Sequence, residues 1–331
     1  MVRADLLISL VKFGLYNDTA RFRKVVESVI AEERSKQHKV LADRLEEALG
    51  TASSTKPLTN GTSLIDQRVS NLFYEIVPRY NLNDLILPNE VRQVCQEVVQ
   101  EQHRVDLLRS YNLEPRNRLL LIGPPGNGKT SLAEAIAEAL MVPLLTVRYD
   151  GVVGAYLGET AVRLRRLIDY VSTRRCVLFF DEFETLGKER GDTHETGEIK
   201  RVVSSLLMQI DSLPSHVVVI GATNHPELLD RAVWRRFQVR MNLPKPTRDR
   251  LTKWFGNFEQ RIKVPLGYKP EALAERLDGV SFAEAEEFGT TIFRQYVLEL
   301  PNSDIKSIVE RNLELWSIRS AKVDRQCEGD D

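Results

Sequence analysis

One stretch constrains the fold of this chain more than any other: Leu119–Ser131, which reads LLLIGPPGNGKTS. The apolar run Leu119–Ile122 predicts a short buried strand, and the apolar residues after Ser131 recur at helical spacing. The pattern Gly-x-x-x-x-Gly-Lys-Thr between them is the phosphate-binding P-loop, in the strand-to-helix setting that such a loop requires. The sequence therefore predicts that the chain binds a nucleotide.

The residues of this loop suit the binding of ATP and Mg²⁺. Its glycines let backbone N–H groups point at phosphate oxygens without a Cβ in the way, and the following helix adds a partial positive charge at its N-terminus. Lys129 is expected to reach the β- and γ-phosphates, and the Thr130 hydroxyl is expected to bind Mg²⁺. The expected nucleotide-binding residues are Gly123, Pro124, Pro125, Gly126, Asn127, Gly128, Lys129, Thr130 and Ser131.

A second apolar run, Val177–Phe180, ends in the carboxylates of Asp181 and Glu182. In a P-loop enzyme we expect such a strand to lie beside the P-loop strand, so that its end faces the γ-phosphate. Asp181 is then expected to hold Mg²⁺, directly or through water. Glu182 is placed to act as the general base that polarises the attacking water. Glu184, two residues further on, carries a weaker meaning.

A third apolar run, Val217–Ile220, leads through Gly-Ala-Thr to Asn224. An asparagine at the end of a strand is often only a turn former. The spacing of Asn224 after Asp181, and the later segment LDRAVWRRF at residues 229–237, favour a functional role for this asparagine instead. We expect the Asn224 amide to orient the attacking water.

Alternating strands and helices predict an α/β fold of the P-loop NTPase type, with a parallel sheet covered by helices. Residues 1–50 are expected to form a small helical bundle that either docks a partner or drives assembly, and 51–66 form a linker. Residues 67–246 are the expected nucleotide-binding subdomain, and 247–331 an all-α lid with a disordered tail. The expected helices include Asn89–Leu108 and, in the lid, Thr247–Ile262, Pro270–Leu277, Phe282–Leu298 and Asp304–Arg319.

Composition narrows the classes of partner. With 42% hydrophobic and 28% charged residues and a formal net charge of −1, the chain lacks a global electrostatic footprint for nucleic acid or an anionic membrane. Three distant cysteines without a CxxC pattern favour reduced thiols in a cytoplasmic protein. The interrupted apolar run Leu6–Val11 favours a helix over a signal peptide, and no apolar run is long enough to span a membrane.

Together, the motifs GPPGNGKT, LFFDE, GATN and LDRAVWRRF resemble those of the classical AAA clade of AAA+ ATPases. The resemblance covers roughly three-quarters of the chain and implies a homo-oligomeric ring, usually a hexamer, with ATP sites between subunits. Arg235 and Arg236 match the paired arginine-finger positions that reach a neighbour's γ-phosphate. The Pro-Gly that usually separates those arginines is missing, which leaves open which of the two is the main arginine finger. Tyr156 and Leu157 resemble the central-pore loop of that clade.

The resemblance implies an ATP-hydrolysing ring motor that remodels or unfolds a protein by threading it past Tyr156, in the service of a protein substrate or a partner enzyme. A plain connecting loop is the alternative interpretation of the segment around Tyr156. One rival function is a DNA-associated loader or helicase accessory, which the net charge and the lack of a DNA-binding motif disfavour. Another is an ATP-gated assembly switch that threads nothing.

Overall fold

The structure, a computed structural model, describes residues 69–152, 158–186 and 205–327, with side chains in the last helix described as far as residue 318. These residues belong to one compact unit, 69–331. The predictions for the bundle 1–50, for the linker 51–66, and for Tyr156 and Leu157 therefore lie outside the described residues. Within the described ranges, no helix combines the length and the apolar character needed to cross a lipid bilayer.

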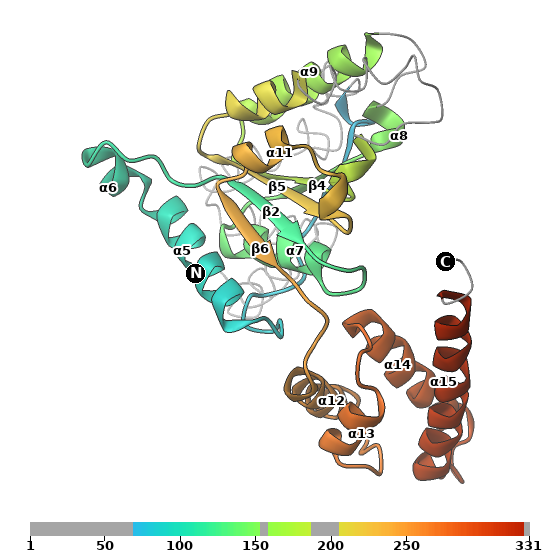
Figure 1. Ribbon diagram of the computed structural model, residues 1–331. Coiled ribbons are helices and arrows are strands. Elements are labelled where there is room, and N and C mark those ends of the chain that lie inside the picture. The colour runs from blue at the N-terminus through green and yellow to red at the C-terminus, as the bar shows by residue number, and fades with distance from the viewer. Residues whose placement is uncertain (1–68, 153–157, 187–204, 328–331) are drawn as a thin grey trace, which may run out of the picture. The chain divides into compact units, whose positions relative to one another are not determined.

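A six-stranded sheet forms the centre of the nucleotide-binding part (Figure 1). Its order is β1-β3-β4-β5-β2-β6, and every neighbouring pair is parallel except β1 with β3. This confirms the predicted α/β fold with a parallel sheet, to which β1 and β6 add edge strands that the sequence did not predict. The strands are β1 (Phe73–Ile76), β2 (Arg118–Ile122), β3 (Leu144–Val147), β4 (Cys176–Phe180), β5 (Val217–Thr223) and β6 (Val239–Asn242).

The prediction that the acidic strand lies beside the P-loop strand is wrong. β5 lies between β4 and β2, pairing Gly221 with Phe180 on one side and Thr223 with Ile122 on the other. A strand that is apolar on both faces suits any interior position of a parallel sheet, so its sequence does not specify its neighbours. The carboxyl ends of the three strands still meet at one edge of the sheet, where parallel α/β folds bind ligands.

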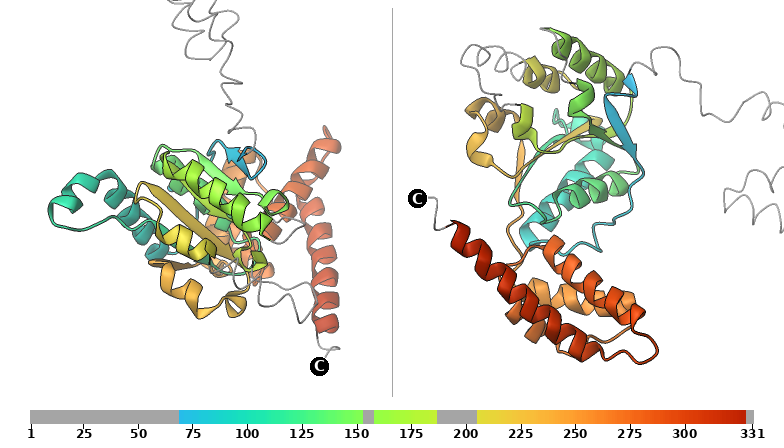
Figure 2. Two further views of the ribbon diagram at one scale, coloured as in Figure 1. Left: turned by 90° about the horizontal axis from the view of Figure 1, so that it is seen from above. Right: turned by 90° about the vertical axis from the view of Figure 1, so that its right-hand side faces the viewer.

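Helices cover both faces of this sheet (Figure 2). In β2, Leu119 and Leu121 pack into a core shared with α5 and α7, whereas Leu120 packs into a core shared with α9 and α11. The predicted helix 89–108 is divided in two at Arg104, and residues 205–211 are helical. The helices are α5 (Asn89–His103), α6 (Val105–Ser110), α7 (Lys129–Ala139), α8 (Tyr149–Val152), α9 (Glu159–Ser172) and α11 (Arg231–Arg236), with 3₁₀ turns at Phe183–Leu186 and Pro226–Leu228.

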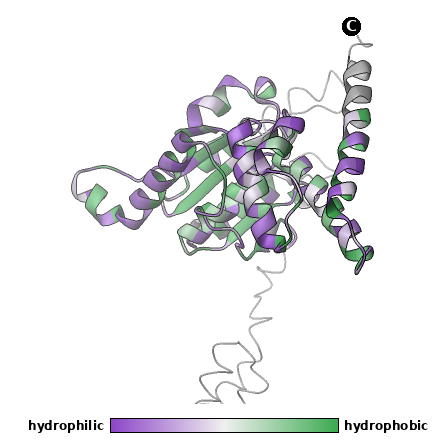
Figure 3. Ribbon diagram, turned by 90° about the horizontal axis from the view of Figure 1, so that it is seen from below, coloured by the Kyte–Doolittle hydropathy of each residue, from purple (hydrophilic) through white to green (hydrophobic). Residues whose placement is uncertain are grey.

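The lid is a four-helix unit with its own core, in which Phe255, Phe288 and Ile292 are buried. Its third helix begins at a capping box, in which the Ser281 hydroxyl accepts from the Glu284 N–H and the Glu284 carboxylate accepts from the Ser281 N–H. Figure 3 shows the hydrophobic strands of the sheet and the hydrophilic stretches of the surrounding helices. The lid helices are α12 (Arg248–Ile262), α13 (Pro270–Arg276), α14 (Phe282–Leu298) and α15 (Ile305–Cys327).

Candidate functional site

The P-loop connects β2 to α7 through a path that requires glycine at one point and favours it at another. A Cβ on Gly123 would lie 2.2 Å from the Leu243 carbonyl oxygen, so any other residue would collide with the chain leaving β6. Gly128 has a φ of +82° and forms the N-cap of α7, which lets the loop turn sharply into that helix. The loop thus leads into the N-terminus of an 11-residue helix, a position that favours bound anions.

Lys129 is held over this loop by three hydrogen bonds. Its Nζ donates to the carbonyl oxygens of Gly123 (2.7 Å) and Pro124 (3.0 Å) and to the side-chain oxygen of Asn224 (2.6 Å). The side chain is buried, and this burial lowers the pKa of the ammonium, while the carboxylates of Asp181 and Glu184 oppose the shift. An ammonium in poor contact with water, beside a helix N-terminus, is well placed to pair with phosphate oxygens.

Thr130 and Asp181 meet across the edge of the sheet. The Thr130 hydroxyl donates to the Asp181 carboxylate at 3.1 Å, although 51 residues separate them in the sequence. Hydroxyl and carboxylate oxygens are ligands of the kind that Mg²⁺ takes. The two side chains predicted to bind the metal are therefore adjacent, and together they fit a Mg²⁺ ion that would neutralise charge on a bound triphosphate.

Glu182 follows Asp181 in an unusual backbone conformation. Its φ is +47°, which is rare for a residue other than glycine and is often associated with functional sites. Its side chain is exposed, whereas Phe183 beside it is buried in the core. The turn thus places the Glu182 side chain in solvent, one residue after Asp181, and the Phe183 ring in the core.

Glu184 takes a larger part in the site than its sequence position suggested. The side chain is only 4% exposed, and its Oε1 accepts a hydrogen bond from the Asn224 backbone N–H at 3.3 Å. Its Oε2 is buried and, among the described residues, has no hydrogen-bond partner. Asn224 therefore lies between Glu184 and Lys129. No local pattern marks this acid for burial, since Asp181 also follows a core phenylalanine and is only half-buried.

The two arginines of the predicted finger pair have different surroundings. Arg236 Nε forms an ion pair with Asp211 at 2.8 Å, and Asp211 also accepts from Arg118. Arg235 is exposed, and among the described residues it makes no hydrogen bond or ion pair. Phe237 packs edge-on against Phe183, with ring centroids 5.6 Å apart, and so ties the end of α11 to the acidic turn.

The structure thus brings part of the predicted site together. Hydrogen bonds join Lys129 to Asn224 and Thr130 to Asp181, and Glu182 adjoins this group through the chain. In the described part of the subunit, neither Arg235 nor Arg236 forms a hydrogen bond or ion pair with this group. The backbone N–H of Ala283 in the lid donates to the Gly126 carbonyl of the P-loop at 3.0 Å, so the lid contacts the loop directly.

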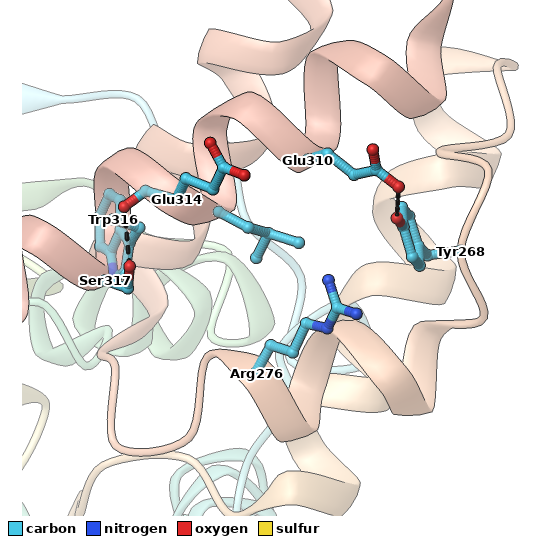
Figure 4. Close-up of a pocket in the computed structure, with 7 residues that line it drawn as sticks. Tyr268, Arg276, Glu310, Glu314, Trp316 and Ser317 are labelled. Atoms are coloured by element: carbon cyan, nitrogen blue, oxygen red, sulfur yellow. Dashed lines mark hydrogen bonds between the residues drawn. The ribbon is translucent and has the colours of Figure 1, made fainter.

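A cavity of about 520 Å³ lies in the lid and is lined by none of these residues (Figure 4). The Tyr268 hydroxyl donates to Glu310 at 2.5 Å, and the Arg276 guanidinium lies 5.2 Å from the Tyr268 ring centre. Tyr268 thus engages both of the charged side chains named here. The cavity therefore does not compete with the P-loop edge as the candidate site.

Known proteins that resemble this chain include ATPases, in agreement with a nucleotide-binding site at the P-loop. Residues 119–245 match the model of the ATPase family associated with various cellular activities (AAA). An AAA family ATPase of Sinorhizobium fredii is 35% identical over 90% of this chain and 91% of its own length. A putative 26S proteasome regulatory subunit homologue of Methanothermobacter marburgensis is 28% identical over 76% of this chain and 68% of its own length. An AAA ATPase of Corynebacterium jeikeium, described as forming ring-shaped complexes, is 31% identical over 62% of this chain and 46% of its own length.

The fold and site define a P-loop ATPase, and the near full-length similarity makes the assignment more specific. The chain belongs to the AAA family of ATPases. This confirms two predictions from the four sequence motifs: the AAA family and the ATPase activity.

Proposed function

We propose that this AAA ATPase is a Mg²⁺-dependent ring motor that remodels or unfolds a protein partner in the cytoplasm. The observation that carries the proposal is the convergence of Lys129, Thr130, Asp181 and Asn224 at one edge of the sheet. Relatives named as ring-forming and as proteasomal regulatory subunit homologues support the assembly and the class of partner. The formal net charge of −1 disfavours the DNA-associated alternative.

The proposed chemistry assigns one task to each side chain. Lys129 binds the β- and γ-phosphates, while Thr130 and Asp181 would hold Mg²⁺, which would neutralise phosphate charge there. Glu182 accepts a proton from water as the water oxygen bonds to the γ-phosphorus. The bond from that phosphorus to the bridging oxygen breaks, and ADP leaves with the electron pair. Asn224 orients the attacking water.

Arg235 is the proposed arginine finger, acting on the ATP bound by a neighbouring subunit. Its exposure, and its lack of a partner in the described part of the subunit, support this contact. Arg236, paired with Asp211, instead fixes the end of α11. A guanidinium supplied from outside couples turnover to assembly, since the site is incomplete in an isolated subunit.

Tyr156 and Leu157 are the proposed grip on the partner polypeptide. They belong to the sequence YLGET, and an aromatic ring offers contact area that does not depend on the sequence it meets. The N-terminal residues 1–50 would dock the partner or support assembly.

A nucleotide-dependent trap tests the proposal. Glu182→Gln should bind ATP but lose turnover by roughly 10²–10⁴-fold, because it lacks the general base. Tagged Glu182→Gln with ATP should retain a protein partner that Lys129→Ala, which cannot bind ATP, does not retain. DNA in the trap would favour the loader alternative, and no retained protein would favour the assembly switch.

The grip is tested with the partner recovered from that trap. Tyr156→Ala should keep basal ATPase activity and lose remodelling of this partner, whereas Tyr156→Phe should be mild because the ring remains. Remodelling by Tyr156→Ala at the wild-type rate would rule out threading past this residue.

A further inference from the structure

Tyr149 makes a contact that none of the sequence motifs accounts for. It is the first residue of α8, and its ring packs against the core that α9 and α11 share. Its hydroxyl donates a hydrogen bond to the main-chain carbonyl oxygen of Asp181 at 2.5 Å. The contact joins the segment after β3 to the turn that follows β4.

The peptide between Asp181 and Glu182 is held at both of its polar atoms. Its carbonyl oxygen accepts from Tyr149, and its N–H donates to the Asp181 side chain at 3.0 Å. The next rotatable bond is the N–Cα bond of Glu182, where φ is +47°. Because a left-handed φ is unfavourable for glutamate, the surroundings must hold it there. The orientation of this peptide therefore sets the direction in which the Glu182 side chain leaves the backbone.

The partner of the hydroxyl makes it a donor, because a main-chain carbonyl oxygen can only accept. Burial raises the pKa of Tyr149, and the carboxylates of Asp181, Glu184 and Glu182 raise it further. The hydroxyl hydrogen is engaged by the Asp181 carbonyl oxygen. Its contribution is geometric.

We propose that Tyr149 is a positioning residue for ATP hydrolysis, whose hydroxyl fixes the Asp181–Glu182 peptide and thereby aims the Glu182 carboxylate. This inference rests on the proposed role of Glu182 as general base. A purely structural hydroxyl would affect folding or nucleotide affinity, whereas a positioning hydroxyl affects the chemical step.

Tyr149→Phe removes the hydroxyl and keeps the ring in its packing. We expect kcat to fall about tenfold, the change that follows from losing one hydrogen bond in the aligned state, with the affinity for ATP unchanged. The turnover is expressed per nucleotide-binding site, so that a loss of folded protein is not counted as a loss of kcat. Tyr268→Phe is the matched control: it loses a hydroxyl hydrogen bond of the same 2.5 Å length, to Glu310 in the lid, and should keep kcat.

A double-mutant cycle identifies the group through which Tyr149 acts. In single-turnover assays with excess enzyme, Tyr149→Phe should cause no further loss in the Glu182→Gln background, because there is no base left to aim. An equal loss in both backgrounds, or a tenfold loss of ATP affinity in place of kcat, would overturn the inference. Full turnover by Glu182→Gln alone would instead overturn the role of Glu182, so the two failures are distinguishable.

Discussion

Replacing each arginine at the end of α11 should separate stability from turnover. Arg236→Ala removes the ion pair with Asp211 at 2.8 Å and a longer hydrogen bond to the Ala232 carbonyl at 3.3 Å. Arg235→Ala, one residue earlier in the same helix, removes an exposed side chain without such contacts in the described part of the subunit. The two variants are therefore matched in position and in chemistry, and differ only in the contacts that the substitution removes.

The structure sets the size of the stability effect. The side chains of Arg236 and Asp211 are 29% and 37% exposed, so water screens the pair, and such pairs are worth about 0.2–1 kcal/mol. Asp211 keeps its contact with Arg118 after the substitution, so no carboxylate is left without a partner. With the weaker bond to Ala232, we expect Arg236→Ala to cost about 1 kcal/mol, or roughly 2–4 °C in Tm for a unit of this size.

Thermal unfolding without nucleotide and steady-state ATP hydrolysis form the assay. Arg236→Ala should lower Tm by this amount and keep most of its turnover. Arg235→Ala should keep the wild-type Tm and lose on the order of 10³-fold or more in kcat, the usual contribution of an arginine finger. The reasoning is refuted if Arg236→Ala unfolds like wild type yet loses turnover as completely as Arg235→Ala.

Two further predictions concern packing. Gly123→Ala should lower Tm strongly, because its Cβ would lie 2.2 Å from the Leu243 carbonyl oxygen, and a raised Tm would contradict the loop geometry. Gly256→Ala, on helix α12 where a Cβ meets open space, should instead raise the free energy of unfolding by about 0.5–1 kcal/mol. Burial raises the pKa of Cys95 and of Cys176 to about 12, so neither should react with a thiol reagent near pH 8 until the chain unfolds. Since an unfolded thiol ionises near pH 8.5, their contribution to stability is present below that pH and is lost as pH rises towards about 12, which alkaline unfolding curves should show.

Local patterns predicted the parts of the site that lie within one stretch of chain. The P-loop and the helix after it depend on neighbouring residues, so Lys129 and Thr130 lie where the motif places them. The lid helix Phe282–Leu298 also matches its predicted bounds, because a Ser281–Glu284 capping box marks its start in the sequence itself.

Features that depend on tertiary pairing were not available from the sequence. Nothing in the sequence of β5 says that it lies between β2 and β4, because all three strands are apolar on both faces. The pairing of Arg236 with Asp211 and the hydrogen bond from Tyr149 to Asp181 join residues 25 and 32 positions apart. In the sequence Glu184 carried only a weaker meaning, whereas the fold buries it and joins it to the Asn224 backbone N–H.

Mixing two inactive variants tests most directly whether ATP sites lie between subunits of a ring. Lys129→Ala lacks ATP binding and Arg235→Ala lacks the finger, so each variant alone should be inactive. In randomly mixed rings at equal amounts, about a quarter of the interfaces join an intact P-loop to an intact Arg235, and ATPase activity should return in that proportion. Continued inactivity in mixtures that native mass spectrometry shows to contain mixed rings would contradict sites shared between subunits.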